Sequence, residues 1–92
     1  MSGLEVRRPE QEELEEKGVF SWPIWEKGPS RFAWSYGEQE VCYLLQGRAT
    51  VEPNEGEPVA IEAGDLVTFP QGMGCTWEIH EAVRKHYCLG EG

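Results

Sequence analysis

Two stretches of the chain decide its fold: WSYGEQEVCYLLQG over residues 34–47 and GDLVTFPQGMGC over residues 64–75. The first becomes almost continuously apolar before its final glycine, which is typical of a strand covered on both faces. The second contains Pro70-Gln-Gly72, a pattern that indicates a tight loop. Because glycine tolerates the positive φ angles of sharp turns, we expect short strands that turn at Gly47 and Gly64.

Outward from these stretches, much of the chain has the two-residue period of β-strands. Phe32, Trp34 and Tyr36 share one face of a strand that starts near residue 31. Turns rich in Gly, Pro and Asn separate the further strands that we expect, over residues 40–46, 48–52, 59–62, 65–69, 75–79 and 83–88. Seven or eight short strands at this spacing predict an all-β antiparallel sandwich or barrel, which we assign to residues 19–92.

The first 18 residues form a separate acidic segment. A short helix is expected from Pro9 to Lys17, since proline suits the first turn, acidic side chains favour the positive end, and Gly18 can stop it. Leu14 is almost its only apolar residue. We therefore expect this helix to lie on the surface and to be dispensable for stability.

Trp22-Pro-Ile-Trp25 follows, and the proline within this apolar run indicates an edge strand. Its two large rings are expected to pack on the barrel or across a homodimer contact.

Composition narrows the class of protein. The 92 residues carry a net charge of −9, with no Lys/Arg stripe to displace counterions from phosphates, so nucleic acid is excluded as an expected partner. No apolar run approaches the ~20 residues that span a membrane, and no signal peptide is visible. Three cysteines without a disulfide-framework spacing fit a reducing cytoplasm.

The two opening stretches resemble the two conserved motifs of the cupin superfamily. The first motif, His-x-His followed by Glu and then Gly, is matched by Glu40 and Gly47, with Trp34 and Tyr36 at the histidine positions. In the second motif, Gly64, Pro70 and Gly72 fit the pattern, and Cys75 replaces the histidine. The resemblance implies a cupin-type jelly-roll barrel that encloses a ligand cavity.

Residues 20–88 are similar, more narrowly, to small cupins related to the cupin domain of (S)-ureidoglycine aminohydrolase. That enzyme releases ammonia from ureidoglycine with a bound manganese ion, whose ligands correspond here to Trp34, Tyr36, Glu40 and Cys75. Only Glu40 is a ready ligand for a hard cation. We therefore expect neither a metal site nor another cofactor in this chain.

The cupin alignment points the same four side chains into the barrel. The period of two adds Cys42 and Leu44 from one strand, and Trp77 and Ile79 from another. The expected cavity is apolar and aromatic with few polar groups, which is typical of a small-molecule site.

Two charged residues are the candidate acid and base of this cavity. Glu40 among rings needs a partner or a raised pKa. In the last strand, Val83, Lys85 and Tyr87 share one face, and we expect that face to point inward, bringing Lys85 toward Glu40. The opposite choice places Arg84 and His86 inside.

The role of Cys75 stays open at this point. It is either a small buried hydrophobe or, with a base or cation nearby, a nucleophile. A zinc site built from Glu40, Cys42, Cys75 and His86 is a further alternative, although no compact ligand spacing supports it.

The sequence therefore predicts a small cytoplasmic cupin that binds a small polar, nitrogen-containing metabolite. In one interpretation the protein is an enzyme whose catalytic residues are Glu40, Lys85 and Cys75. Its substrate is then bound by Trp34, Tyr36, Cys42, Trp77 and Tyr87. In the other, the barrel senses or sequesters its ligand without turnover. A metal-dependent aminohydrolase-like enzyme is the third alternative.

Overall fold

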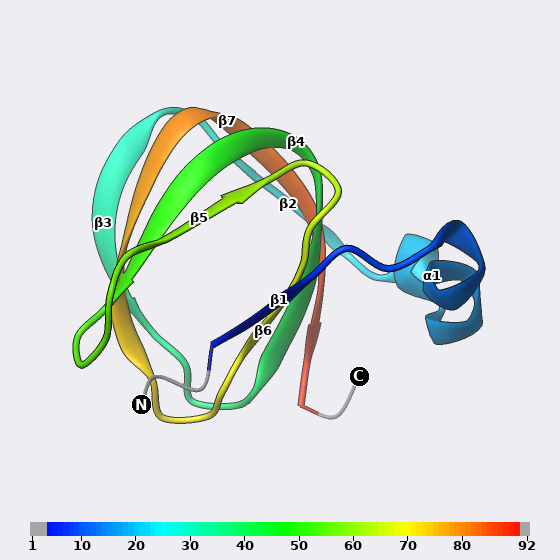
Figure 1. The fold of residues 1–92 in the computed structure, drawn as a ribbon, viewed down its shortest axis with the longest axis horizontal. Coiled ribbons are helices and arrows are strands. Elements are labelled where there is room, and N and C mark those ends of the chain that lie inside the picture. Colours follow the sequence, from blue (N-terminus) through cyan, green and yellow to red (C-terminus); the bar gives the residue numbers. More distant parts are fainter. Residues whose placement is uncertain (1–3, 91–92) are drawn as a thin grey trace.

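The structure, a computed structural model, describes residues 4–90 (Figure 1). Its elements are β1 (Glu5–Arg7), α1 (Gln11–Lys17), a 3-10 turn (Val19–Ser21), β2 (Ile24–Lys27), β3 (Ser30–Ser35), β4 (Glu40–Pro53), β5 (Val59–Glu62), β6 (Leu66–Phe69) and β7 (Gly74–Leu89). The prediction of an all-β fold with one short N-terminal helix is confirmed. No helix among the described residues is long and apolar enough to cross a membrane.

All strand pairs are antiparallel, and the strands curl around a common interior (Figure 1). The order along the sheet is β1-β6-β4-β7-β2, while β3 pairs with β7 and β5 pairs with β4. The inward faces form the core, which includes the predicted inward residues Cys42, Leu44, Trp77 and Ile79. Alternation along β4 and β7 therefore identified these four interior positions correctly.

The two longest strands each join two of the predicted ones. β4 covers residues 40–53 and β7 covers residues 74–89, and they pair from Glu40 opposite Leu89 to Pro53 opposite Cys75. The register shifts between Leu44 and Ala49, around Gly47. Gly47 therefore lies in an irregularity within one strand and not in a turn between two, as is typical of glycine at a β-bulge.

Gly47 meets two constraints at once. Its φ is +95°, and a Cβ at this position would lie 2.2 Å from the backbone oxygen of Ala82 on β7. Gly72 has a similar φ of +85°, but a Cβ there would have no neighbour within 4 Å. Substitutions at the two glycines therefore distinguish the cost of backbone strain, present at both, from the cost of a clash with β7, present only at Gly47.

We predict that Gly47→Ala lowers the free energy of unfolding by about 3 kcal/mol or more, because strain and a backbone clash combine. Gly72→Ala should lose only about 1–2 kcal/mol from the left-handed backbone. Urea unfolding of both variants tests this. Equal losses would contradict the close approach at Gly47.

The N-terminal segment is more tightly attached than the sequence indicated. β1 was not predicted, and it pairs with β6 through Val6 opposite Val67. Leu14 is only 2% exposed and packs in a second cluster with Val19 and Leu66. The helix lies on the surface as expected. One buried leucine and a strand pairing nevertheless hold the segment to the barrel, so we now expect it to contribute to stability.

Arg8 adds a polar attachment for the same segment. Its guanidinium lies 3.0 Å from Asp65 Oδ1 and 2.7 Å from Glu62 Oε2. Asp65 is buried, and its other oxygen accepts a hydrogen bond from the backbone N–H of Glu62. Arg8 thus neutralises a carboxylate that has little contact with water.

We predict that Leu14→Ala lowers the free energy of unfolding by about 2–5 kcal/mol, the usual loss for a buried leucine. Glu16→Ala, an exposed position on the same helix, is the matched control and should change it little. Chemical denaturation measures both. If the two variants unfold alike, the helix does not contribute to stability through Leu14.

Candidate functional site

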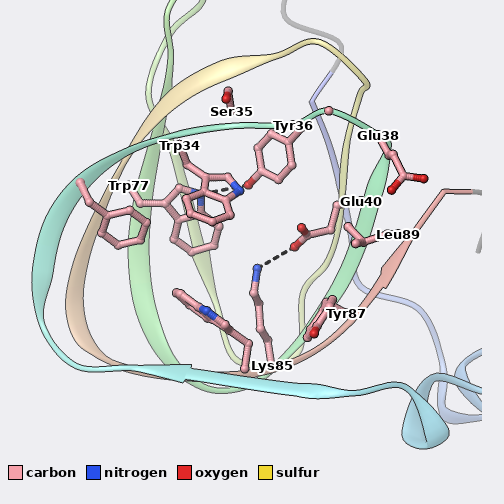
Figure 2. Close-up of a pocket in the computed structure, with 12 residues that line it drawn as sticks. Trp34, Ser35, Tyr36, Glu38, Glu40, Trp77, Lys85, Tyr87 and Leu89 are labelled. Carbon is pink, nitrogen blue, oxygen red and sulfur yellow. Dashed lines mark hydrogen bonds and ion pairs between the residues drawn. The ribbon is translucent and has the colours of Figure 1, made fainter.

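One end of the barrel holds a cavity of about 420 Å³ (Figure 2). Strands β2, β3, β4 and β7 contribute its walls, together with the loop that follows β3. Its lining is mostly aromatic and consists of Trp25, Phe32, Trp34, Ser35, Tyr36, Gly37, Glu38, Glu40, Trp77, Lys85, Tyr87 and Leu89. A largely apolar hollow with a few polar groups is typical of small-molecule sites.

A buried ion pair lies in this cavity. Lys85 Nζ donates a hydrogen bond of 2.8 Å to Glu40 Oε2, and the two side chains are only 7% and 9% exposed (Figure 2). Glu40 begins β4, and Lys85 reaches it from the last third of β7, where it lies opposite Leu44. The pairing satisfies two charges that would each be costly to bury alone.

Three aromatic rings surround the ammonium group of Lys85. Its Nζ lies 4.8 Å from the ring centre of Trp77, 4.9 Å from that of Trp25 and 5.9 Å from that of Phe69. Each ring presents a negative face to the cation, an attraction that strengthens where water is excluded. The rings and the carboxylate together hold Lys85 in place.

The second oxygen of Glu40 is available to a ligand. Within residues 4–90, Glu40 Oε2 accepts from Lys85, while no hydrogen bond reaches Oε1. No buried side-chain nitrogen or oxygen in this described part of the chain lacks a partner, so Oε1 keeps contact with the cavity space. An ionised carboxylate oxygen in this position accepts a proton or a hydrogen bond.

Tyr36 and Trp77 form a rigid wall. The indole N–H of Trp77 donates to Tyr36 Oη at 3.1 Å, and the Tyr36 ring stacks on Phe69 with centres 4.6 Å apart. Burial raises the pKa of Tyr36 far above its ordinary value, so the phenol stays neutral. Tyr36 therefore lines the cavity as a packed ring with an engaged hydroxyl group.

Trp34 does not lie in the barrel interior, where the alternation of residues along its strand predicted it. We expected it inside the barrel, but its side chain is 52% exposed and lies at the cavity mouth. It meets Phe32 edge to face, with ring centres 6.5 Å apart. The reason is that β3 ends at Ser35, so Trp34 lies where the strand leaves the covered part of the barrel.

The last strand presents the predicted face to the interior. Val83 and Lys85 are buried inside, and Tyr87 lines the cavity. Arg84 points outward, 3.5 Å from Glu26. The alternative with Arg84 and His86 inside is therefore wrong.

His86 is nevertheless buried, on the outer side of the barrel. Its Nδ1 lies 2.9 Å from the backbone oxygen of Trp22, and the ring of Phe20 packs against it edge to face. The 3-10 turn and the residue after it cover this outer face, and they bury His86 with a hydrogen-bond partner.

The two inner cysteines are core residues that do not line the cavity with Glu40 and Lys85. Cys42 and Cys75 are 0% and 2% exposed. Burial raises the pKa of Cys42 to about 11, although the nearby Lys85 opposes the shift, and burial likewise raises the pKa of Cys75. Both thiols are therefore protonated near neutral pH, and the thiolate that a nucleophile needs is scarce.

We predict that only Cys88, which is half-buried, reacts quickly with a thiol reagent in the folded protein near pH 8. Cys42 and Cys75 should react after denaturation, when all three cysteines become available. Cys88→Ser should remove the fast phase. A fast phase that survives in this variant would restore Cys75 as a candidate nucleophile.

The residues present do not fit a cupin metal. Of the four positions that correspond to metal ligands, Trp34 and Tyr36 offer rings and a neutral phenol, Cys75 offers a buried thiol, and Glu40 already binds an ammonium. Within residues 4–90, no group of three or more His, Cys, Asp or Glu is placed to hold a metal ion.

The alternative zinc site of Glu40, Cys42, Cys75 and His86 is contradicted by position. Its histidine lies on the outer side of the barrel, against Trp22 and Phe20, while the other three residues belong to the interior.

Several residues that line the cavity were not predicted from the sequence. Phe32 shares the face of Trp34 and Tyr36, so the period of two could have identified it. Trp25 faces the cavity because β2 pairs with β7 in a register that puts it opposite Lys85. No local sequence signal predicts that register. Glu38 and Leu89, at the rim, follow from loop and strand-end geometry that the sequence does not reveal.

Antiparallel strands that curl around a common interior, with a cavity at one end, are consistent with a cupin-type jelly-roll barrel. The chain belongs to the EutQ-like cupin domain family, whose sequence profile matches residues 14–87. No curated protein matches the sequence at a significant level.

Solved structures agree with this assignment. A DUF861 family protein from Thermotoga maritima is 48% identical, with a TM-score of 0.92 over 94% of this chain and 98% of that one. A protein described as ethanolamine utilization protein Q from Salmonella typhimurium is 25% identical, with a TM-score of 0.66 over 73% of this chain and 54% of that one. The EutQ protein of Clostridium difficile shares the fold at 21% identity and a TM-score of 0.66, over 73% of this chain and 52% of that one. The chain thus spans about half the length of the two EutQ proteins.

Proposed function

We propose that this protein binds a small polar, nitrogen-containing metabolite in its aromatic cavity, and that Glu40 and Lys85 carry out metal-independent acid–base chemistry on it. The observation that carries the proposal is the buried Glu40–Lys85 pair, whose second carboxylate oxygen is free toward the cavity. The three free cysteines support a site of action in a reducing cytoplasm.

The lining supports a ligand with a flat or apolar part and an N–H donor. Phe32 and Trp34 offer ring surface at the mouth, and Tyr87 adds a ring with a hydroxyl group. Glu40 Oε1 accepts a hydrogen bond from an amine, amide or ureido N–H. Glu38 at the rim adds negative charge, which favours such donors over anions.

Two resemblances support the same ligand class. The Salmonella typhimurium relative is named for ethanolamine utilization, and ethanolamine is a small amine. The likeness of residues 20–88 to the cupin domain of (S)-ureidoglycine aminohydrolase also concerns a small nitrogen-rich compound. Neither identifies the ligand of this chain, because fold likeness and site chemistry are separate matters.

The proposed chemistry uses the two ends of the ion pair. Glu40 Oε1 takes a proton from the bound ligand, and Lys85 Nζ gives a proton to another ligand atom as negative charge develops there. After the carboxyl group rotates, this proton passes from Glu40 to Lys85 across the 2.8 Å contact, which restores the starting state. Such a site moves protons within its ligand without a co-substrate.

A second candidate function is binding without turnover. It is favoured by the self-contained ion pair and by the engaged hydroxyl group of Tyr36, which leaves few groups to act on a ligand. In that case the cavity recognises the metabolite through Glu40 Oε1 and the rings alone.

We predict that native mass spectrometry of freshly purified protein detects a bound small molecule, and that Glu40→Gln lowers its occupancy at least about tenfold, by loss of a charge-assisted hydrogen bond. Glu78→Gln is the matched control, because Glu78 is exposed and pairs with Arg31 away from the cavity. Unchanged occupancy in Glu40→Gln would refute the assignment of the site.

The same ligand, once identified, separates enzyme from binder. Incubated with wild type and followed by NMR, an acid–base enzyme converts it, and Glu40→Gln slows the conversion by about 10²-fold or more. A binder returns the ligand unchanged.

A further inference from the structure

We infer that Lys85 is the resident cation of this barrel: its ammonium group, fixed to β7, neutralises Glu40 in the place where the cupin pattern would have a divalent metal ion. The neutralisation of Glu40 by Lys85 does not depend on which ligand the cavity binds.

The first support is the contact itself. Glu40 is the one carboxylate among the four positions that correspond to metal ligands, and its Oε2 lies 2.8 Å from Lys85 Nζ. Both side chains are more than nine-tenths buried. A divalent ion bound at the same oxygen would lie beside the ammonium group, and the two positive charges would repel each other strongly in this poorly solvated interior.

The second support is the surroundings of the ammonium group. The faces of Trp25 and Trp77 lie 4.9 Å and 4.8 Å from Nζ, and Phe69 lies 5.9 Å away (Figure 2 shows Trp77 beside Lys85). Indole and phenyl rings attract a soft, singly charged ammonium through their π faces. They supply no lone pairs of the kind that Mn²⁺ or Zn²⁺ requires.

The third support is that the other three positions that correspond to metal ligands offer no free ligand. Trp34 is half exposed at the mouth, the Tyr36 hydroxyl accepts from Trp77, and Cys75 packs in the core. None of these groups points a free anionic ligand at Glu40. A metal ion there would have one protein ligand, whereas Lys85 has a carboxylate and three rings.

One consequence is that the charge of the cavity does not depend on metal supply. Because the cation belongs to the chain, a chelator cannot remove it. The pocket therefore presents the same Glu40 oxygen and the same ammonium group in the presence and absence of divalent ions.

The first test uses the wild-type protein alone. After dialysis against EDTA and return to buffer, we expect no change in melting temperature on adding Mn²⁺ or Zn²⁺ and no stoichiometric metal by elemental analysis. A metal bound at Glu40 would raise the melting temperature by several degrees. Such a rise, absent from Glu40→Gln, would overturn the inference.

The second test is a double-mutant cycle measured by urea unfolding. Lys85→Met keeps the length of the side chain but leaves Glu40 buried without a cation, so its unfolding midpoint should fall clearly. Adding Glu40→Gln to Lys85→Met should recover much of that loss, because replacing a buried pair is tolerated far better than breaking it. Lys27→Met is the matched control, since Lys27 is exposed and lies 5.3 Å above the Phe32 ring.

The outcomes of the cycle are distinct. If Lys85→Met fails to fold while the double variant folds, the inference is supported. If Lys85→Met unfolds like Lys27→Met, or the double variant is no more stable than Lys85→Met, Lys85 does not neutralise Glu40 and the inference is wrong. Loss of ligand in Glu40→Gln is a separate result, so the proposed function can fail while this cycle succeeds, and the reverse.

Discussion

The antiparallel pairing of β4 with β7 is the constraint on which the rest of the structure depends. These strands run side by side from Glu40 opposite Leu89 to Pro53 opposite Cys75, and nearly every other strand pairs with one of them. Because a sheet must curl to bury both strands, the pairing also requires the irregularity at Gly47, where β7 approaches too closely for any side chain. The same pairing places Glu40 opposite Leu89 and Lys85 opposite Leu44, close together on adjacent strands, which is how Glu40 meets a residue 45 positions away in the sequence.

The cavity chemistry follows from that meeting. Burying a carboxylate and an ammonium group costs solvation energy that their attraction offsets only with good geometry and further partners. Here the geometry is a 2.8 Å contact, and the further partners are the faces of Trp25, Trp77 and Phe69. The aromatic lining thus has two roles, since Trp25 and Trp77 line the cavity and also stabilise the cation within it. An apolar pocket built in this way carries a charged pair that the chain itself supplies.

The family assignment concerns the fold of this chain, whereas its chemistry depends on the residues of the site. The EutQ-like cupin profile covers most of the chain, and the Thermotoga maritima relative matches nearly all of it. The matching part covers only about half of each of the two EutQ proteins, so what they do as whole proteins extends beyond the part that this chain shares. A barrel of this kind is a scaffold on which metal sites, acid–base pairs and plain binding pockets can each be built.

The sequence by itself determined where most of the strands lie, the turn at Gly64 and the inward faces that carry Cys42 and Trp77, and it favoured the inward face of Lys85 over the alternative. These features are local: a period of two and the backbone freedom of glycine are legible within a few residues. The tertiary structure alone decided that Leu14 is buried and that Trp34 lies at the mouth. It also decided that Trp25 stands opposite Lys85 and that His86 is covered from outside. Alternation tells which residues share a face, but not which strand lies opposite or where the barrel rim falls, because both depend on pairings between residues far apart in the chain.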